Sequence, residues 1–395
     1  MEAVGDRKVF GAGLVLALRR MAPPILLVGL PLAWVVMSTK TARAAGVELG
    51  FDFQGTLWEP ARALLDGSRI YPEPTSTSIL VGNPSVYPPL FILLTVPLAL
   101  VPVSVAAWIW LAILASAVVG ALWCLGVRDW RCYLIALTSP VVVQGLGWGN
   151  LTLLLVLPLA LTWRYRDRAL LAGVSLGVAI AAKLFVLPLV AWLLFTRRFK
   201  AAAISLASAI ALILGPWMLI GFEGFAEYPA LLDAVKDVYA PRSGSLTGAL
   251  ASSGLDITIA VAIASSVAIV GLVAAAIVVR KDNGDRKAFA IVVAACIVAS
   301  PIVWPNYFAL MFVPVAVAWP RLAPAWFFGY ACWLVEFLPK RESVPIPCCR
   351  PHDVPSIVWT MTHSIPAPWY AFGMTCVLVA LASWCVARPR SGGVQ

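Results

Sequence analysis

The chain has 395 residues, of which 61% are hydrophobic and only 12% are charged, and its mean hydropathy is +0.91. Soluble domains carry about twice that share of charged residues, so the composition excludes an ordinary soluble protein. The net charge of +10 is concentrated in short loops rich in lysine and arginine, which is typical of the cytoplasmic side of a membrane protein. We therefore predict an all-α, polytopic integral membrane protein without a nucleic-acid partner.

The first apolar run, Met21 to Met37, lacks a clear signal-peptidase site and is predicted to take the chain out of the cytoplasm. A first external loop follows over residues 38–86. Tyr87 to Pro102 is predicted to bring the chain back, and Val103 to Gly126 to take it out again.

This path has a consequence for the next segment. Arg128 and Arg131 fall outside, against the rule that places short basic loops inside, and the next basic loop begins at Arg164. The stretch Cys132 to Trp163 is therefore expected to cross an odd number of times. One of its two apolar pieces, which are separated by Gly145 to Asn150, dips into the membrane without crossing.

Two later segments are predicted to be broken helices. Arg168 and Arg197 are both expected on the cytoplasmic side, but the sequence between them is too short for two full crossings. Two half-helices with Lys183 near their tip satisfy this constraint. Lys287 and Arg321 enclose a similar pair, with Ser300 to Asn306 at the tip. Such tips are tolerated where they line a cavity within the protein, so we expect one shared cavity that opens outward.

The remaining path adds a second external loop over residues 221–256 and a third over residues 339–367. The sum is about twelve crossings in a single domain, residues 1–395, with both termini in the cytoplasm. Because the long, mixed-charge loops all lie outside, we expect the function to face outward from the plasma membrane.

Asp52 is the first candidate functional residue because it lies just outside the first apolar run. The alternative is a solvated loop carboxylate. An amphipathic stretch follows, which Gly67 is expected to end and which we expect to lie flat on the membrane. Its apolar face comprises Leu57, Trp58, Ala61, Leu64 and Leu65, and its polar face comprises Glu59, Arg62 and Asp66.

Lys183 is the second candidate, because it ends an apolar stretch and a lysine within a membrane segment is functional by default. The alternative is that it reaches a nearby interface. Other polar and aromatic residues stand at the tips, where they could also be helix contacts or interfacial residues: Asn150, Asn306, Tyr307, Trp148 and Trp304. A lysine opposite an acid suits a phosphate-bearing substrate and an acid that takes a proton.

A metal site is not expected. The adjacent Cys348 and Cys349 with His352 supply three candidate ligands, whereas a structural zinc site needs four.

Several short motifs, in this order and spacing over about residues 20 to 320, resemble glycosyltransferase family 87. They are Asp52-Phe53 with Trp58, Ala61, Gly67 and Tyr71; Tyr87-Pro88-Pro89-Leu90; Gly149-Asn150-Leu151; Lys183 and Pro188 ahead of Arg197-Arg198; and Ser300-Pro301 with Trp304 and Tyr307. The chain departs from the family pattern twice. Trp148 stands where Gln follows Gly, and Asn306 stands where the family has His before the late Tyr.

The resemblance implies a GT-C-type membrane fold and transfer of mannose or arabinofuranose from a polyprenyl-phosphate donor to a glycolipid or polysaccharide acceptor, on the outer face and among membrane lipids. It implies an inverting reaction with Asp52 as the general base and no cofactor or metal. Donor-phosphate contacts are expected from Lys183, Arg62, Asn306 and Tyr307, with Arg242 as a further candidate. Substrate contacts are expected from Trp58, Tyr87, Trp148, Asn150 and Trp304.

The leading alternative is a transporter or a flippase for polyprenyl lipids, because broken helices that meet at a cavity also occur there. A transporter places its polar residues at the membrane midplane, whereas a transferase of this kind places them toward the outer leaflet. A purely structural membrane protein leaves Lys183 unexplained.

Overall fold

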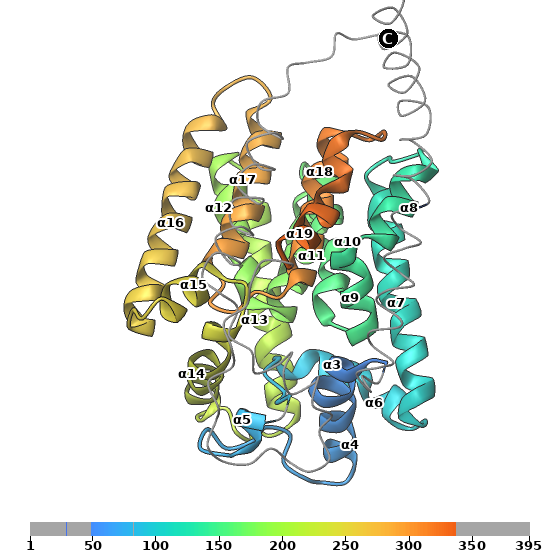
Figure 1. Ribbon diagram of the computed structural model, residues 1–395, viewed down its shortest axis with the longest axis vertical. Helices are drawn as coiled ribbons and strands as arrows, with labels where there is room; N and C mark the ends of the chain where they lie inside the picture. Colours follow the sequence, from blue (N-terminus) through green and yellow to red (C-terminus); the bar gives the residue numbers. More distant parts are fainter. Residues whose placement is uncertain (1–28, 30–48, 82, 337–395) are drawn as a thin grey trace, which may run out of the picture.

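The computed structural model describes residues 29, 49–81 and 83–336 (Figure 1). Every regular element within these ranges is a helix, which confirms the predicted all-α class. The first apolar run, the third external loop with the Cys348, Cys349 and His352 group, and the C-terminal tail lie outside the described residues.

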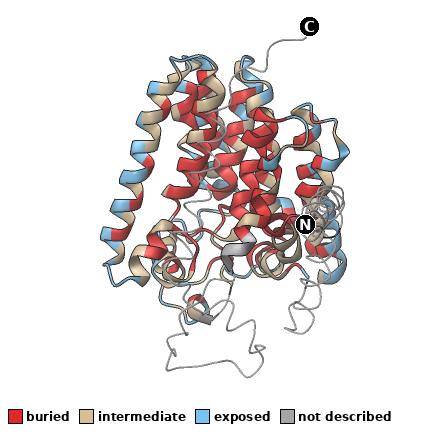
Figure 2. Cartoon of the chain, turned by 45° about the horizontal axis from the view of Figure 1, so that its top comes forward, coloured by how far each residue is buried: buried red, intermediate tan, exposed pale blue. Residues whose placement is uncertain are grey.

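Among the described residues, three helices are long and apolar enough to cross a membrane: α7 (Val103–Cys124), α13 (Phe199–Leu219) and α16 (Ile257–Val278). Helix α7 coincides with the predicted crossing over Val103 to Gly126. At 1.5 Å per residue each of the three is about 30 Å long, the thickness of the hydrocarbon core. Helix α16 stands at one edge of the bundle with most of its surface exposed, as Figure 2 shows. Its buried residues, Ala260, Ala264, Ala268 and Ala275, are small, which allows close packing on α17.

Short helices from both described external loops gather at one end of the bundle, the lower end in Figure 1. They are α3 (Phe51–Phe53), the π-helical turn η2 (Gln54–Trp58), α4 (Glu59–Leu65), α5 (Ser78–Val81), α14 (Tyr228–Tyr239), the turn η5 (Ala240–Arg242) and α15 (Leu246–Ser252). The Tyr228 hydroxyl donates to the Val86 carbonyl at 2.7 Å and so joins the two loops. We refer to this end as the outer end, following the predicted topology.

The amphipathic stretch forms the predicted helix, and Gly67, with a φ of +67°, ends it as expected. Leu57 and Ala61 are fully buried, but Leu65 is exposed and does not belong to the buried face. That face packs on α6 (Pro89–Ala99) of the same chain. The expectation that its apolar face rests on lipid is therefore wrong, because protein covers the central residues of that face.

The predicted return crossing over Tyr87 to Pro102 is also wrong. Helix α6 has 11 residues, which at 1.5 Å per residue is about 16 Å and half of a span. Helix α7 then starts at the outer end and carries the chain to the opposite end (Figure 1). There Asp129 accepts a hydrogen bond from the Leu322 backbone at 3.1 Å, next to the basic residue Arg321. Arg128 and Arg131 thus lie at the same end as Arg321, the end at which the predicted topology places the short basic loops.

The stretch Cys132 to Trp163 does not cross an odd number of times. It comprises α8 (Trp130–Thr138), α9 (Pro140–Trp148), the 3₁₀ turn η3 (Leu151–Leu155) and α10 (Val156–Arg164). The chain bends by 119° at Gly149 and Asn150. It then returns to the end from which it came, so the Gly-rich break is the turning point of a re-entrant segment. The total of about twelve crossings stays a prediction.

Both predicted half-helix pairs are confirmed. The first is α11 (Ala169–Ala182), the 3₁₀ turn η4 (Leu184–Val186) and α12 (Leu189–Phe195), with Lys183 at the break. The second is α17 (Gly284–Ala299), the 3₁₀ helix η6 (Pro305–Met311) and α18 (Phe312–Ala318), with Ser300 to Trp304 at the break. The turn η7 (Pro324–Phe327) and α19 (Phe328–Glu336) complete the described chain.

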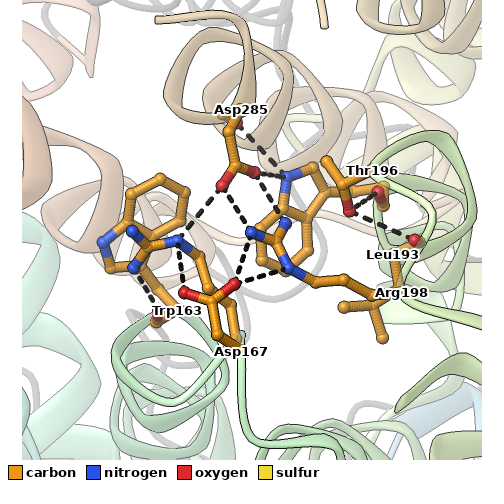
Figure 3. A network of polar contacts seen from close by, with 8 residues as sticks. Trp163, Asp167, Leu193, Thr196, Arg198 and Asp285 are labelled. Atoms are coloured by element: carbon orange, nitrogen blue, oxygen red, sulfur yellow. Dashed lines mark hydrogen bonds and ion pairs between the residues drawn. The ribbon is translucent and has the colours of Figure 1, made fainter. Parts of the chain in front are cut away.

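An ion-pair cluster at the end opposite the outer end holds these segments together (Figure 3). Asp285 at the start of α17 pairs with Arg166 at 3.1 Å and with Arg198 at 2.9 Å, and it accepts a hydrogen bond from Trp192 at 2.9 Å. Asp167 pairs with Arg198 at 2.9 Å. We call these five residues the basal clasp. It explains why Arg166 and Arg198 lie at the same end, as the half-helix prediction requires.

Candidate active site

Asp52 lies in α3, which is held in place by contacts between glycines. The Gly50 backbone donates to the Gly147 carbonyl at 2.8 Å. A Cβ atom on Gly149 would lie 2.8 Å from the Phe53 Cβ, so the close approach of the two segments requires a glycine there. Gly149 also has a φ of +70°, which allows the sharp turn into η3. These contacts bring Asp52 to the re-entrant tip.

Trp110 of α7 also holds α3 against the re-entrant tip. Its indole stacks on Phe53 with ring centroids 5.3 Å apart and donates to the Gly149 carbonyl at 2.8 Å. Trp110 is the eighth residue of α7 and therefore lies about 10 Å along a helix of about 30 Å. The tip and Asp52 thus lie on the outer side of the middle of the span.

The Asp52 carboxylate is held between two amides. Its Oδ1 accepts from Asn83 Nδ2 at 3.1 Å and its Oδ2 accepts from Asn150 Nδ2 at 2.7 Å. The Tyr87 hydroxyl faces the same carboxylate. Burial of the carboxyl raises the pKa of Asp52 above its ordinary value, against the opposing effects of the Lys183 charge and the two amides. A carboxylate of raised pKa and fixed orientation is suited to accept a proton.

Lys183 lies at the break between α11 and η4, where the backbone is extended and directs the side chain inward. The residue is only 7% exposed. Its ammonium donates to Thr152 Oγ1 at 2.7 Å, to Tyr307 OH at 3.1 Å and to Asn150 Oδ1 at 3.4 Å. This geometry excludes the alternative that Lys183 reaches out to an interface.

Two aromatic rings enclose the ammonium. It lies 4.4 Å from the ring centroid of Tyr307 and 5.0 Å from that of Tyr87, both within the range of cation–π attraction. Phe185 stacks on Tyr307 at 5.0 Å and fixes that ring. The first loop, the re-entrant tip and both half-helix tips therefore meet at one place, as their polar residues predict.

The other expected site residues take different positions. Trp148 and Trp304 pack edge to face with centroids 6.2 Å apart, which links the re-entrant tip to the tip before η6. Trp58 donates to the Leu98 carbonyl and Arg62 to the Ala99 carbonyl, at 3.2 and 3.3 Å. The polar groups of Trp58 and Arg62 are thus directed to the backbone of α6.

Asn306 is completely buried, and neither its Oδ1 nor its Nδ2 has a hydrogen-bond partner among the described residues. Its Cβ lies 3.0 Å from where a Cβ on Gly145 would be, so it packs tightly against α9. An unpaired buried amide costs about 1–3 kcal/mol. Such a cost is typical of functional positions.

Arg242 lies in η5 of the second external loop, and the residues that follow it contact the tip before η6. The Gly244 backbone donates to the Val303 carbonyl at 2.8 Å, and Ser245 Oγ donates to the Pro301 carbonyl at 2.7 Å. Arg242 Nη1 is enclosed without a hydrogen-bond partner, and no ion pair forms with it in the described part of the chain. Burial lowers the pKa of this guanidinium.

Two residues of the site were missed by the sequence analysis. Thr152 could have been found, because an asparagine side chain often accepts a hydrogen bond from the backbone N–H two residues later. Asn150 does so here with the Thr152 backbone and thereby keeps Thr152 next to the site. Asn83 carries no such signal. It reaches Asp52 only because the segment after α5 folds over Gly55, where a Cβ would lie 3.0 Å from the Asn83 carbonyl oxygen.

The described residues contain no group of three or more His, Cys, Asp or Glu side chains arranged to hold a metal ion. The residues that meet at the site supply a carboxylate, two amides, two phenols and a lysine.

The chain matches the family model of glycosyltransferase family 87 over residues 86–305, which is more than half of its length. The chain belongs to glycosyltransferase family 87. Asn150, Lys183 and the tip Ser300 to Trp304 lie inside the matched range, whereas Asp52 and Asn83 precede it. Together with the apolar helices, membership of family 87 identifies a membrane protein of glycosyltransferase type.

A relative in Mycobacterium tuberculosis (strain CDC 1551 / Oshkosh) is the polyprenol-phosphate-mannose-dependent alpha-(1-2)-phosphatidylinositol pentamannoside mannosyltransferase. The family 87 chain described here is 26% identical to it over 403 residues, which cover 93% of this chain and 86% of the relative.

Proposed function

We propose that this protein is an inverting glycosyltransferase of GT-C type that moves a mannose from a polyprenyl-phosphate donor to a glycolipid or polysaccharide acceptor at the outer face of the plasma membrane. The observation that carries the proposal is the Asp52 carboxylate held between Asn83 and Asn150 where the helix tips meet. The name of the mycobacterial relative supports the donor. Arabinofuranose, the other sugar of our expectation, is tested beside mannose.

In this mechanism Asp52 accepts the proton of an acceptor hydroxyl, and the hydroxyl oxygen forms a bond to the anomeric carbon. The bond from that carbon to the phosphate oxygen breaks on the opposite face, and polyprenyl phosphate leaves with the electron pair. The leaving group needs no proton, because a phosphate is stable as an anion. No metal is required by these steps, so transfer is expected to persist in EDTA.

The phosphate needs positive potential and hydrogen-bond donors as its charge grows. Lys183 supplies positive charge at the site, and Tyr307 lies beside it. Asn306 has an unpaired amide, and Arg242 has an unpaired guanidinium nitrogen next to the tip Pro301 to Trp304. Arg62 is a weaker candidate because its guanidinium is bound to Ala99 and Asp66.

The depth of the site favours a transferase over a transporter or flippase. Gly50 packs on Ala107 and Phe53 packs on Trp110, the fifth and eighth residues of α7, so the neighbourhood of Asp52 lies about 6–10 Å from the start of that helix. A transporter site is expected near the midplane, about 15 Å from either end.

The test is to incubate the purified protein in lipid with labelled polyprenyl-phosphate mannose or polyprenyl-phosphate arabinofuranose and a cell-envelope lipid extract. A new labelled glycolipid with the mannose donor, absent for Asp52→Asn, is the expected result. Movement of labelled donor lipid between leaflets without sugar transfer would support the flippase instead. Failure of both donors overturns the proposal.

A further inference from the structure

The ammonium of Lys183 has no proton left for a substrate. A lysine ammonium carries three N–H donors and no acceptor. All three have an acceptor inside the protein: Thr152 Oγ1, Tyr307 OH and Asn150 Oδ1. A phosphate could bind Lys183 directly only if the ammonium left one of these acceptors.

The same contacts fix the orientation of Asn150. Its Oδ1 accepts from Lys183 and also from the Thr152 backbone at 2.9 Å, so its amide nitrogen must point the other way. There it donates to Asp52 at 2.7 Å. Turning the amide by 180° would place its NH₂ group against two donors, one of them charged, and would present an oxygen to the Asp52 carboxylate.

We propose that Lys183 is a positioning residue that acts through Asn150 to hold the Asp52 carboxylate in place and ionised, and that it does not bind the donor phosphate itself. This inference rests on the proposed role of Asp52 as the general base. It assigns the phosphate to groups that have no internal partner, above all the Arg242 guanidinium and the Asn306 amide.

The charges around Asp52 agree with this role. The groups that face the carboxylate are the Lys183 ammonium, the Tyr87 hydroxyl and the neutral amides of Asn83 and Asn150, and the Tyr307 hydroxyl lies beyond them. Lys183 is the single cation among them. Its charge is the largest effect that opposes burial of Asp52, so removing it raises the pKa of Asp52 further and favours the protonated, inactive acid.

The first experiment measures protonation of Asp52 without using activity. Dicyclohexylcarbodiimide enters membranes and modifies protonated carboxyl groups, and peptide mass spectrometry reads the labelling of Asp52 as a function of pH. In Lys183→Met the pH of half-labelling should rise by about one unit or more, the usual effect of losing a nearby opposite charge. Lys236→Met, which removes a lysine of α14 that pairs with Asp233, is the matched control and should follow the wild type.

The second experiment separates positioning from phosphate binding. With polyprenyl-phosphate mannose as donor, Lys183→Met should lower kcat by about tenfold or more and shift the acidic limb of the pH–rate profile upward. The donor KM should stay within about threefold, because uniform binding is not lost. Lys183→Arg keeps the charge and should retain the wild-type profile better than Lys183→Met, which controls for misfolding.

Two results would overturn the inference. Coincident labelling curves for the wild type and Lys183→Met would show that Lys183 does not act on Asp52. A rise of about tenfold in donor KM with an unchanged kcat and pH profile would make Lys183 a phosphate ligand. Absence of transfer by the wild-type protein would refute the proposed function alone, since the labelling curves still decide whether Lys183 controls the carboxylate.

Discussion

The two ends of the molecule each place an aspartate near basic side chains, two arginines at one end and one lysine at the other, but the contacts differ. In the basal clasp, Asp285 binds Arg166 and Arg198 directly, at 3.1 and 2.9 Å. At the outer end, Asn150 lies between Asp52 and Lys183 and binds both. Direct pairing occupies the lone pairs of a carboxylate and favours its ionised form. Such a carboxylate is a poor base because it binds a proton weakly. An intervening amide transmits orientation, and it leaves the carboxylate free to take a proton.

The largest effect is expected from Asp52→Asn, which removes proton acceptance and little else. Transfer should fall by at least about 100-fold, within the range of about 10²–10⁴ known for general bases. The midpoint of thermal unfolding should stay unchanged or rise, because the variant no longer buries a charge. Asp66→Asn, at the exposed end of α4, is the control. If Asp52→Asn keeps more than about a tenth of the wild-type activity, Asp52 is excluded as the base.

Asp285→Ala should show the opposite pattern, with a loss of stability before any specific loss of chemistry. It leaves Arg166 and Arg198 with only the exposed Asp167 as a shared partner, and we expect about 2–3 kcal/mol of destabilisation, less than the roughly 3–5 kcal/mol of a fully buried pair. Thermal unfolding in detergent measures this effect. Asp167→Ala removes a carboxylate that is 74% exposed and should cost far less. Equal effects of the two variants would show that Asp285 is not the centre of the clasp.

Asn306→Leu should separate stability from function. Removing a buried amide that has no partner should stabilise the fold by up to about 1–3 kcal/mol, unless the larger side chain strains the contact with Gly145. The donor KM should rise because a polar contact to the phosphate is lost. Asn306→His should keep or tighten donor binding, and more so below about pH 6.5, where an imidazole gains charge. Unchanged donor kinetics in both variants would place Asn306 outside the site.

The smallest effect is expected at Asn83, which holds the carboxylate from one side only. Asn83→Ala should lower kcat by about tenfold, the value of one hydrogen bond to a charged group, and leave the donor KM nearly unchanged. Gln54→Ala, which removes a contact with Glu59 on the exposed surface, is the matched control. A loss at Asn83 as large as that at Asp52 would mean that Asn83 has a part in the reaction beyond orienting the carboxylate.

Charge and length were sufficient to predict the broken helices. Arg168 and Arg197 are too close in the sequence for two full crossings, so the positive-inside rule left only half-helices with Lys183 between them. The predicted topology placed Arg128 and Arg131 outside, against this rule, because the apolar segment of α6 was interpreted as a full crossing. That helix has only 11 residues and packs under α4, a tertiary contact that hydropathy does not encode.

The partners of the site residues could be predicted only in part. The motifs at the predicted tips contain Asn150, Lys183 and Tyr307, and the motif in the first external loop contains Asp52. These residues meet because the tips and this loop meet. Arg62 was grouped with them by its place on the polar face of α4, but the long side chain turns to the Ala99 carbonyl. Asn83 could not be predicted, since its contact depends on how the segment between α5 and α6 folds over Gly55.

The π-helical turn η2 joins α3 to α4 and sets the angle about the helix axis between the side chains of these two helices. An α-helix advances by about 100° for each residue, and a π turn accommodates one residue more than an α turn. Because η2 lies between Asp52 and Ala61, it determines that one points to the re-entrant tip while the other points to α6. Deleting Gly55 would convert the turn to a regular helix of almost the same length. The two helices would then keep their relative orientation, whereas a regular α-helix through all the residues, Gly55 included, would turn Asp52 away from Asn150 by about a quarter of a revolution. The extra residue of the π turn is therefore accommodated without a change at the site.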